Sequence, residues 1–355
     1  MKNIKTSLWI GLAVLAVILV SAWWFTRDRV VLPRGESEAE TILVNEETGQ
    51  VVTDAERALP GLLLQRSVMV TDGVRHLVPL DEIRGGGPPK DGIPSIDDPI
   101  FVAAAEADFI DDREPGLAFS HNEVDRFYPF QILVWHEIVN DVVGGQRVLI
   151  TYCPLCLSGV VFDPLVQGER VEFGTSGKLW QSNLVMYDRK TDSLWSQILG
   201  ESILGEMTGT RLTLLPSDQI RFGEWKAAHP DGQVLSRDTG AVRSYGFDPY
   251  GDYYTDDGQI ISPVNASDPR LENKDFILGL VIDGAAKAYY PPAVKAKGEV
   301  VDTFAGITIV ANYDDALDVV RLFEREPDGT LTRLNPFASF WFSWMAAHPD
   351  TELYN

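Results

Sequence analysis

Two cysteines, Cys153 and Cys156, are the only thiols in this 355-residue chain, and they lie in the stretch VLITYCPLCLSG. A Cys-x-x-Cys spacing suits three kinds of chemistry: a redox-active dithiol, part of a metal site, or a disulfide that pins a turn. In thioredoxin-like proteins the pair opens a helix, whose N-terminus lowers the pKa of the thiol. Here the residues that follow, LSGVVFDP, have the pattern of a second strand. The sequence therefore predicts a tight turn between two strands, which favours a metal knuckle over a thioredoxin-type helix start.

A metal knuckle needs ligands beyond two thiols, because protein metal sites use three or more side chains. His136, in VWHEIVND, is the first candidate, and Met186, in NLVMYD, is a second. Sulfur ligands with an imidazole would suit copper, and zinc is the alternative. Each residue also has an ordinary interpretation, because histidines often bridge strands by hydrogen bonds and strand methionines often pack in cores. Both interpretations stay open for both residues.

An internal repeat is the strongest pattern in the rest of the chain. A Tyr-Pro pair is followed eight residues after the proline by EIVND in the first copy and by EVVD in the second. Later, EWKAAHPDGQVL matches SWMAAHPDTELY, so that a histidine closes a predicted helix in each copy. This alignment pairs His136 with Gly298 and Glu137 with Glu299, and it sets NYDDA opposite the cysteines. We expect the first copy to carry the chemistry and Glu137 to belong to the shared scaffold.

The elements that must position these residues are mostly strands. Runs such as RVLITY, NLVMYD, GITIVANY and VVRLFE are short, β-branched and bounded by turns, whereas helical patterns are few. We predict an α+β, β-dominated fold, in which an internally duplicated unit forms sandwich-like or barrel-like sheets with a few short helices. The first repeat, with the CPLC site and an inserted hairpin region, should span residues 61–240, and the second, degenerate repeat residues 241–355.

The N-terminus predicts attachment to a membrane. Residues 8–25, LWIGLAVLAVILVSAWWF, carry no charge and would form about 27 Å of helix, close to the thickness of a bilayer core. A cleavable signal peptide is the alternative, but its apolar core should be shorter and should end in small residues. We predict a transmembrane anchor or signal in residues 1–26, a polar linker in residues 27–60, and a periplasmic or extracellular location for the bulk of the chain.

Composition narrows the classes of function. The net charge of −22 argues against a nucleic-acid partner, because polyanions are bound through patches of lysine and arginine. The chain has none of the phosphate-binding, nucleophile-elbow or HExxH motifs that mark large enzyme classes.

Several motifs together suggest a family. They are GGPPKDGIPSIDDP, WHEIVND, TYCPLC, FGTSGKLWQSNLVMYDRKTDSLWSQ and FWFSWMAAHPDTELY. From about Leu62 onward the chain resembles the family catalogued as domain of unknown function 3179, found in bacterial and archaeal proteins. The resemblance implies no particular activity.

The residues therefore predict a membrane-anchored extracytoplasmic protein with a site of Cys153 and Cys156. The site would bind a soft metal, copper or zinc, with His136, or it would cycle between dithiol and disulfide. One alternative is a non-catalytic structural or binding module in which the CPLC disulfide is a staple. Another is a thiol oxidoreductase that acts on a protein partner, and a metal-delivery partner belongs to the metal hypothesis.

Overall fold

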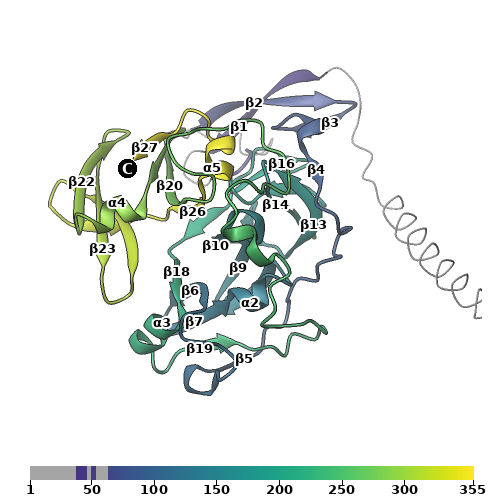
Figure 1. Ribbon diagram of the computed structural model, residues 1–355. Coiled ribbons are helices and arrows are strands. Elements are labelled where there is room, and N and C mark those ends of the chain that lie inside the picture. Colours follow the sequence, from purple (N-terminus) through teal and green to yellow (C-terminus); the bar gives the residue numbers. More distant parts are fainter. Residues whose placement is uncertain (1–36, 46–48, 53–62) are drawn as a thin grey trace, which may run out of the picture.

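β-Strands dominate the protein, whose computed structural model describes residues 37–45, 49–52 and 63–355. The sheets are arranged in a ring, like the blades of a four-bladed propeller (Figure 1). Helices are short, and the longest α-helices in the described part of the chain run for seven residues. The prediction of a β-dominated fold with a few short helices is confirmed.

The predicted membrane segment, residues 8–25, lies outside the described residues, as does much of the predicted linker. Within the described ranges, no helix combines the length and the apolar character needed to cross a membrane. Part of the linker segment is a strand, because β1 (Glu38–Asn45) pairs antiparallel with β2 (Leu63–Thr71). Ile42 and Val44 of this strand share one face and are buried against Val68.

The first repeat is built from two sheets. One has the strand order β18-β6-β7-β19-β5 and the other has the order β17-β10-β9-β8. The elements of this repeat are β5 (Phe101–Ala103), β6 (Pro115–His121), β7 (Val124–Pro129), α2 (Phe130–Leu133), β8 (Ile138–Val143), β9 (Gln146–Cys153), the 3-10 turn η4 (Pro154–Cys156), β10 (Ser158–Asp163), β17 (Thr213–Leu215), β18 (Asp218–Arg221), α3 (Phe222–Ala228) and β19 (Gln233–Leu235).

The second repeat also consists of two sheets, with the orders β26-β20-β21-β27 and β22-β23-β24-β25. Its elements are β20 (Phe276–Ile282), β21 (Ala285–Tyr289), α4 (Pro291–Lys295), β22 (Glu299–Phe304), β23 (Ile307–Asp314), β24 (Val319–Arg325), β25 (Leu331–Arg333), β26 (Phe337–Phe340), α5 (Trp341–Ala347) and β27 (Glu352–Tyr354). Strand for strand, these sheets have the order of β18-β6-β7-β19 and β8-β9-β10-β17 in the first repeat.

The two repeats also share their internal contacts. In each, the last strand follows a seven-residue helix and pairs in parallel, β19 with β7 and β27 with β21. Tyr128 donates a hydrogen bond to Asp141 at 2.6 Å, and Tyr289 donates one to Asp302 at 3.0 Å. The histidines of the two AAHPD motifs directly follow α3 and α5, as predicted. The internal repeat is confirmed.

Additional strands separate β10 from β17 in the first repeat, whereas β24 runs directly into β25 in the second. Four of them join strands from the N-terminal part in an eight-stranded sheet of order β1-β2-β3-β16-β15-β14-β13-β4. The remaining elements are β3 (Val74–His76), η2 (Leu80–Glu82), β4 (Arg84–Gly85), η3 (Ala104–Glu106), β11 (Leu165–Val166), β12 (Glu169–Arg170), β13 (Phe173–Trp180), β14 (Asn183–Asp188), β15 (Leu194–Ser196), β16 (Glu201–Leu204) and η5 (Gly251–Tyr254).

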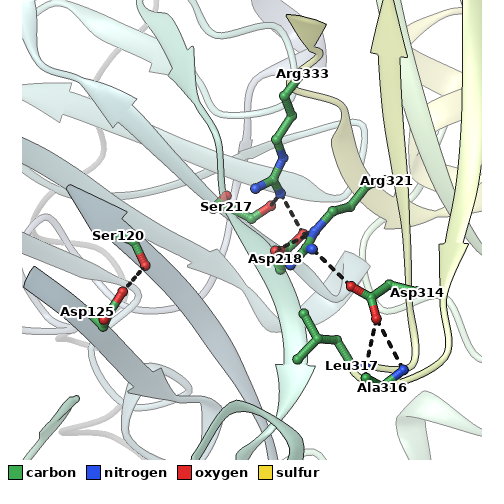
Figure 2. A network of polar contacts seen from close by, with 9 residues as sticks. All are labelled: Ser120, Asp125, Ser217, Asp218, Asp314, Ala316, Leu317, Arg321 and Arg333. Carbon is green, nitrogen blue, oxygen red and sulfur yellow. Dashed lines mark hydrogen bonds and ion pairs between the residues drawn. The ribbon is translucent and has the colours of Figure 1, made fainter. Parts of the chain in front are cut away.

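An ion-pair network connects the two repeats (Figure 2). Asp218 of β18 lies between two arginines of the second repeat, 2.7 Å from Arg321 and 2.6 Å from Arg333. Arg321 also contacts Asp314 at 3.2 Å, and Asp314 accepts backbone hydrogen bonds in the turn that follows β23. Asp314 therefore has a structural role in the second repeat.

Candidate functional site

The CPLC turn has the predicted layout of a strand, a tight turn and a strand. β9 ends at Cys153, η4 forms one turn, and β10 begins at Ser158, which pairs with Cys153 across the hairpin. Leu157 closes the turn in the left-handed conformation, with a φ of 50°. No helix follows the second cysteine, so the thiols do not have the helix N-terminus of a thioredoxin-type site.

Both thiols are free and buried, and they lie where the two repeats and the inserted strands meet. Cys153 is 2% exposed and Cys156 is fully buried. The apolar cluster around them includes Trp195 from the inserted strands and Trp341 and Trp344 from α5 of the second repeat. In this closed arrangement, a partner protein has no direct access to either sulfur.

Polar side chains surround the sulfur of Cys156. Asn183 Nδ2 lies 2.9 Å from it and donates a hydrogen bond, and Ser158 Oγ lies at 3.1 Å. Burial raises the pKa of the Cys156 thiol, but hydrogen bonding with Cys153, Ser158, Asn183 and Ser343 outweighs burial and lowers the pKa below its usual value. The arrangement therefore favours a thiolate at Cys156.

The side chain of Asn183 is fixed by its neighbours. Its Oδ1 accepts a hydrogen bond from the backbone N–H of Ile198 at 2.9 Å, which turns Nδ2 toward the sulfur. Nδ2 also donates to Oε1 of Gln197 at 3.0 Å. Gln197 in turn donates to Thr151 Oγ1 at 2.8 Å and to the Ser158 carbonyl at 3.2 Å. This buried network holds the donor in place before any reaction occurs.

Cys153 has a different environment. Its sulfur lies 3.8 Å from the carbonyl oxygen of Ser182, which can only accept a hydrogen bond. Burial, the hydrogen bond with Cys156 and the Cys156 charge raise the pKa of the Cys153 thiol well above its usual value. The turn therefore combines a stabilised thiolate at Cys156 with a protonated thiol at Cys153.

Glu137 is the acidic group of the site. The residue keeps some exposure, but the packing around its carboxyl and, second, the charge of Cys156 raise the pKa of Glu137 to about 8. Its carbonyl accepts a hydrogen bond from the backbone N–H of Tyr152 at 2.7 Å, which places Glu137 across the ladder from the residue before Cys153. The carboxyl is thus largely protonated at neutral pH.

The second repeat and the inter-repeat segment cover the turn. Ser343 of α5 is one of the groups that lower the pKa of Cys156, and its Oγ donates to the carbonyl of Gln181 at 3.0 Å. Tyr253 of η5 is buried and donates a hydrogen bond to the Leu155 carbonyl at 2.7 Å. Lys274 holds Tyr253, since its Nζ lies 3.1 Å from the ring centroid and donates to the Tyr253 carbonyl. The second repeat therefore completes the site.

The ring of His136 makes its hydrogen bonds with groups other than the two thiols. Nδ1 lies 2.7 Å from the Pro94 carbonyl and must donate to it, so Nε2 accepts from the hydroxyl of Tyr245 at 2.6 Å. Burial lowers the pKa of His136. Among the contacts of the described residues, none joins its ring to either sulfur. Met186 is buried on β14 in the same apolar cluster as the cysteines.

The metal site stays a prediction. Within the part of the chain that the structure describes, no group of three or more His, Cys, Asp or Glu side chains has an arrangement that could hold a metal ion. Cys153 and Cys156 are brought together, whereas His136 is engaged with Pro94 and Tyr245.

The sequence alignment of the repeats was wrong by one residue at Glu137. In the hairpins of both repeats, Tyr152 N–H bonds to the Glu137 carbonyl and Tyr313 N–H bonds to the Gly298 carbonyl. Glu137 is therefore the counterpart of Gly298, and the residue after it, Ile138, is the counterpart of Glu299. The similar letters of E-I-V-N-D and E-V-V-D suggest that their glutamates are equivalent, but the pairing of the strands shows that they are offset by one residue. Glu137 belongs to the site and not to the shared scaffold.

Comparison with known proteins identifies a family for the chain. A family model described as "Protein of unknown function (DUF3179)" matches residues 90–351. The chain belongs to this family. The resemblance inferred from the motifs is confirmed, and the DUF3179 match includes the CPLC turn, Glu137, the inserted strands and α5. No curated protein and no solved structure matches the chain.

Proposed function

We propose that this protein is a thiol–disulfide redox protein in which Cys156 is the attacking thiolate and Cys153 is the resolving thiol. The observation that carries the proposal is the difference between the two sulfurs. Asn183 donates to Cys156 at 2.9 Å, whereas Cys153 itself donates to the Ser182 carbonyl, at 3.8 Å. A dithiol pair needs one sulfur that reacts as a thiolate and one that keeps its proton until the second step.

The proposed reaction is exchange with an external disulfide. The Cys156 thiolate attacks one sulfur of that disulfide, whose S–S bond breaks, and one half leaves as a thiolate. Cys153 then loses its proton and attacks the Cys156 sulfur, which forms the Cys153–Cys156 disulfide and releases the other half. Two electrons pass from the pair to the external disulfide, and the reverse sequence reduces the pair.

The burial of both sulfurs favours small reactants over a protein partner. Reaction with the cysteine of a protein would require the segment around Tyr253 to move away from the Leu155 carbonyl. We further propose that residues 8–25 anchor the protein and that the redox site faces an oxidising compartment outside the cytoplasm. The apolar length of this segment supports the proposal.

The experiment is a redox titration of the full-length protein in detergent with glutathione buffers of defined ratio. Alkylation and mass spectrometry count the free thiols at each ratio. A reversible Cys153–Cys156 disulfide is expected, and Cys153→Ser should accumulate a mixed disulfide with glutathione at Cys156. Cys156→Ser, which keeps only the Cys153 thiol, should form a mixed disulfide with glutathione much more slowly than Cys153→Ser. A disulfide whose reduction potential lies below about −300 mV would instead mean a structural staple. The absence of a disulfide at every glutathione ratio would refute the redox proposal.

Binding of a soft metal is the second candidate, and the lowered pKa of Cys156 favours it because metals bind thiolates. Copper and zinc are measured in protein purified without chelators and in the Cys153→Ser/Cys156→Ser double variant. Stoichiometric metal that disappears in the double variant would support this function over redox exchange. His136→Ala would then test whether the imidazole contributes to affinity.

A further inference from the structure

Glu137 occupies a backbone position that usually requires glycine. Its φ is 59°, in the left-handed region, and the counterpart Gly298 has a φ of 77°. Both residues make the same backbone contacts, since Glu137 N–H bonds to the Leu133 carbonyl and Gly298 N–H bonds to the Val294 carbonyl. A side chain in this conformation costs about 1–2 kcal/mol relative to an ordinary one. The first repeat therefore keeps a carboxyl where the fold itself needs none.

The first repeat has the carboxyl and both thiols, and the second repeat has none of the three. Cys153 faces Ser158 across its hairpin as Asp314 faces Val319, so Asp314 is the counterpart of Cys153. By the same register the counterpart of Cys156 is Leu317. The second repeat thus lacks both thiols and the carboxyl while it keeps the strands that carry them. This association links Glu137 to the chemistry of the pair.

The environment of the carboxyl contains acids and no base. The titratable groups that face it are Cys156 of η4, Cys153 of β9 and Tyr250 of the inter-repeat segment. Within the described residues no cation contributes, and the carboxyl accepts no hydrogen bond. A carboxylate and a thiolate in such a place repel each other, so one negative charge is favoured over two.

Glu137 is also more exposed than the two thiols. Cys153 and Cys156 are buried, whereas Glu137 is half-buried. Glu137 lies opposite Tyr152, the residue before Cys153 in β9. Protons that leave a buried dithiol need a group through which to reach solvent. Packing and the charge of Cys156 raise the pKa of Glu137 to about 8, which suits a group that exchanges protons near neutral pH.

We propose that Glu137 is the proton partner of the Cys153–Cys156 pair and that its proton is bound in the dithiol state and released in the disulfide state. This inference rests on the proposed redox function. The reduced site holds a Cys153 thiol, a Cys156 thiolate and a protonated Glu137. Oxidation forms the S–S bond, leaves Glu137 as a carboxylate and releases two protons and two electrons, which convert one external disulfide into two thiols.

The test compares the pH dependence of the redox equilibrium in the full-length protein and in Glu137→Gln, from about pH 6 to about pH 9. Each proton released on oxidation changes the equilibrium constant about tenfold per pH unit, which is about 30 mV for a two-electron couple. The wild-type slope should exceed the Glu137→Gln slope by up to that amount. Equal slopes in the two proteins would overturn the inference.

A redox-difference infrared spectrum gives a second readout that does not depend on activity. The C=O band of a protonated carboxyl should disappear when the wild type is oxidised, and this change should be missing in Glu137→Gln. The exposed Glu299, beside the counterpart glycine, supplies the control Glu299→Gln, which should behave as wild type. A wild type without any reversible disulfide would refute the redox function itself. A reversible couple without a carboxyl band would refute only the role of Glu137.

Discussion

Asn183 points its amide nitrogen at the sulfur of Cys156 from 2.9 Å. The amide cannot turn away, because its oxygen is held by the backbone N–H of Ile198 at 2.9 Å. The donor comes from β14 in the strands that only the first repeat contains, and the sulfur comes from the turn after β9. The inserted strands therefore supply part of the chemistry of the site as well as part of the core.

The first prediction concerns this hydrogen bond. Replacing Asn183 by alanine should raise the pKa of Cys156 by about one to two units, since hydrogen bonds to charged groups contribute about 1.5–3 kcal/mol. The ultraviolet absorbance of the thiolate, titrated in Cys153→Ser and in Cys153→Ser/Asn183→Ala, measures the shift without requiring access of a reagent. Asn335→Ala, which removes a hydrogen bond to the Leu214 carbonyl at 3.0 Å, is the control. An unchanged titration in the Asn183 variant would show that the donor does not stabilise the thiolate.

The second prediction concerns access to the site. Tyr253→Phe removes the hydrogen bond of 2.7 Å to the Leu155 carbonyl. The free energy needed to open the inter-repeat segment should fall by about 1 kcal/mol, which raises the population of the open form about fivefold. The alkylation rate of Cys156 should rise by that factor at a fixed pH, while the thiolate titration stays as in wild type. Tyr290→Phe, which loses a hydrogen bond of 3.0 Å to Asp275, serves as the matched control. Equal rates in all three proteins would mean that reagents reach the sulfur by another route.

Local patterns in the sequence were enough to predict the strand-rich fold, the repeat and the turn between β9 and β10. LSGVVFDP reads as a strand because its apolar and β-branched residues suit a buried sheet, and the structure has β10 there. The repeated AAHPD motifs mark equivalent helix ends because proline and the preceding residue disfavour further helix.

The partners of the sulfurs could not be predicted in the same way. Gln197 and Ser343 meet the turn only after folding, and nothing in their local sequence points to Cys156. Glu137 was missed for another reason: the hairpin register sets it against Gly298, whereas a comparison of letters sets it against Glu299. A glycine opposite a non-glycine at a turn is a signal that could have revealed it.

The third prediction concerns pH and stability. Burial lowers the pKa of His348 to about 4 from 6.5, and its Nε2 is buried without a partner in the described part of the chain. Below about pH 6.5 the unfolded chain binds a proton that the folded imidazole does not, so the free energy of unfolding falls as the pH falls toward 4. The loss due to this group should be about 2 kcal/mol between pH 7 and pH 5.

Urea unfolding of the wild type and of His348→Gln at the two pH values checks this contribution. The variant should lose about 2 kcal/mol less than the wild type, because every other titrating group is shared by both proteins. His229→Gln is the control, since the equivalent His229 has a carboxylate partner, Asp125, at 3.1 Å. Parallel pH profiles in the wild type and His348→Gln would contradict the prediction.

The last prediction concerns the strain at Glu137. Replacing Glu137 by glycine, the residue of the second repeat, removes a side chain from the left-handed region and takes a carboxyl away from the Cys156 thiolate. The gain of about 1–2 kcal/mol from relief of strain exceeds the cost of about 0.5–1 kcal/mol for the more flexible unfolded chain. The free energy of unfolding, measured by urea denaturation, should therefore rise by up to about 1 kcal/mol.

The opposite change in the second repeat isolates the backbone contribution. A Cβ added at Gly298, whose φ is 77°, would meet no other atom within 4 Å, so Gly298→Ala should lose about 1 kcal/mol through conformation alone. If Glu137→Gly lowers the stability while Gly298→Ala behaves as expected, the Glu137 side chain makes a net stabilising contribution. The first repeat would then keep Glu137 for its packing. A gain in stability together with a loss of the pH-dependent redox slope would instead show a residue kept for its proton, at the expense of a more stable fold.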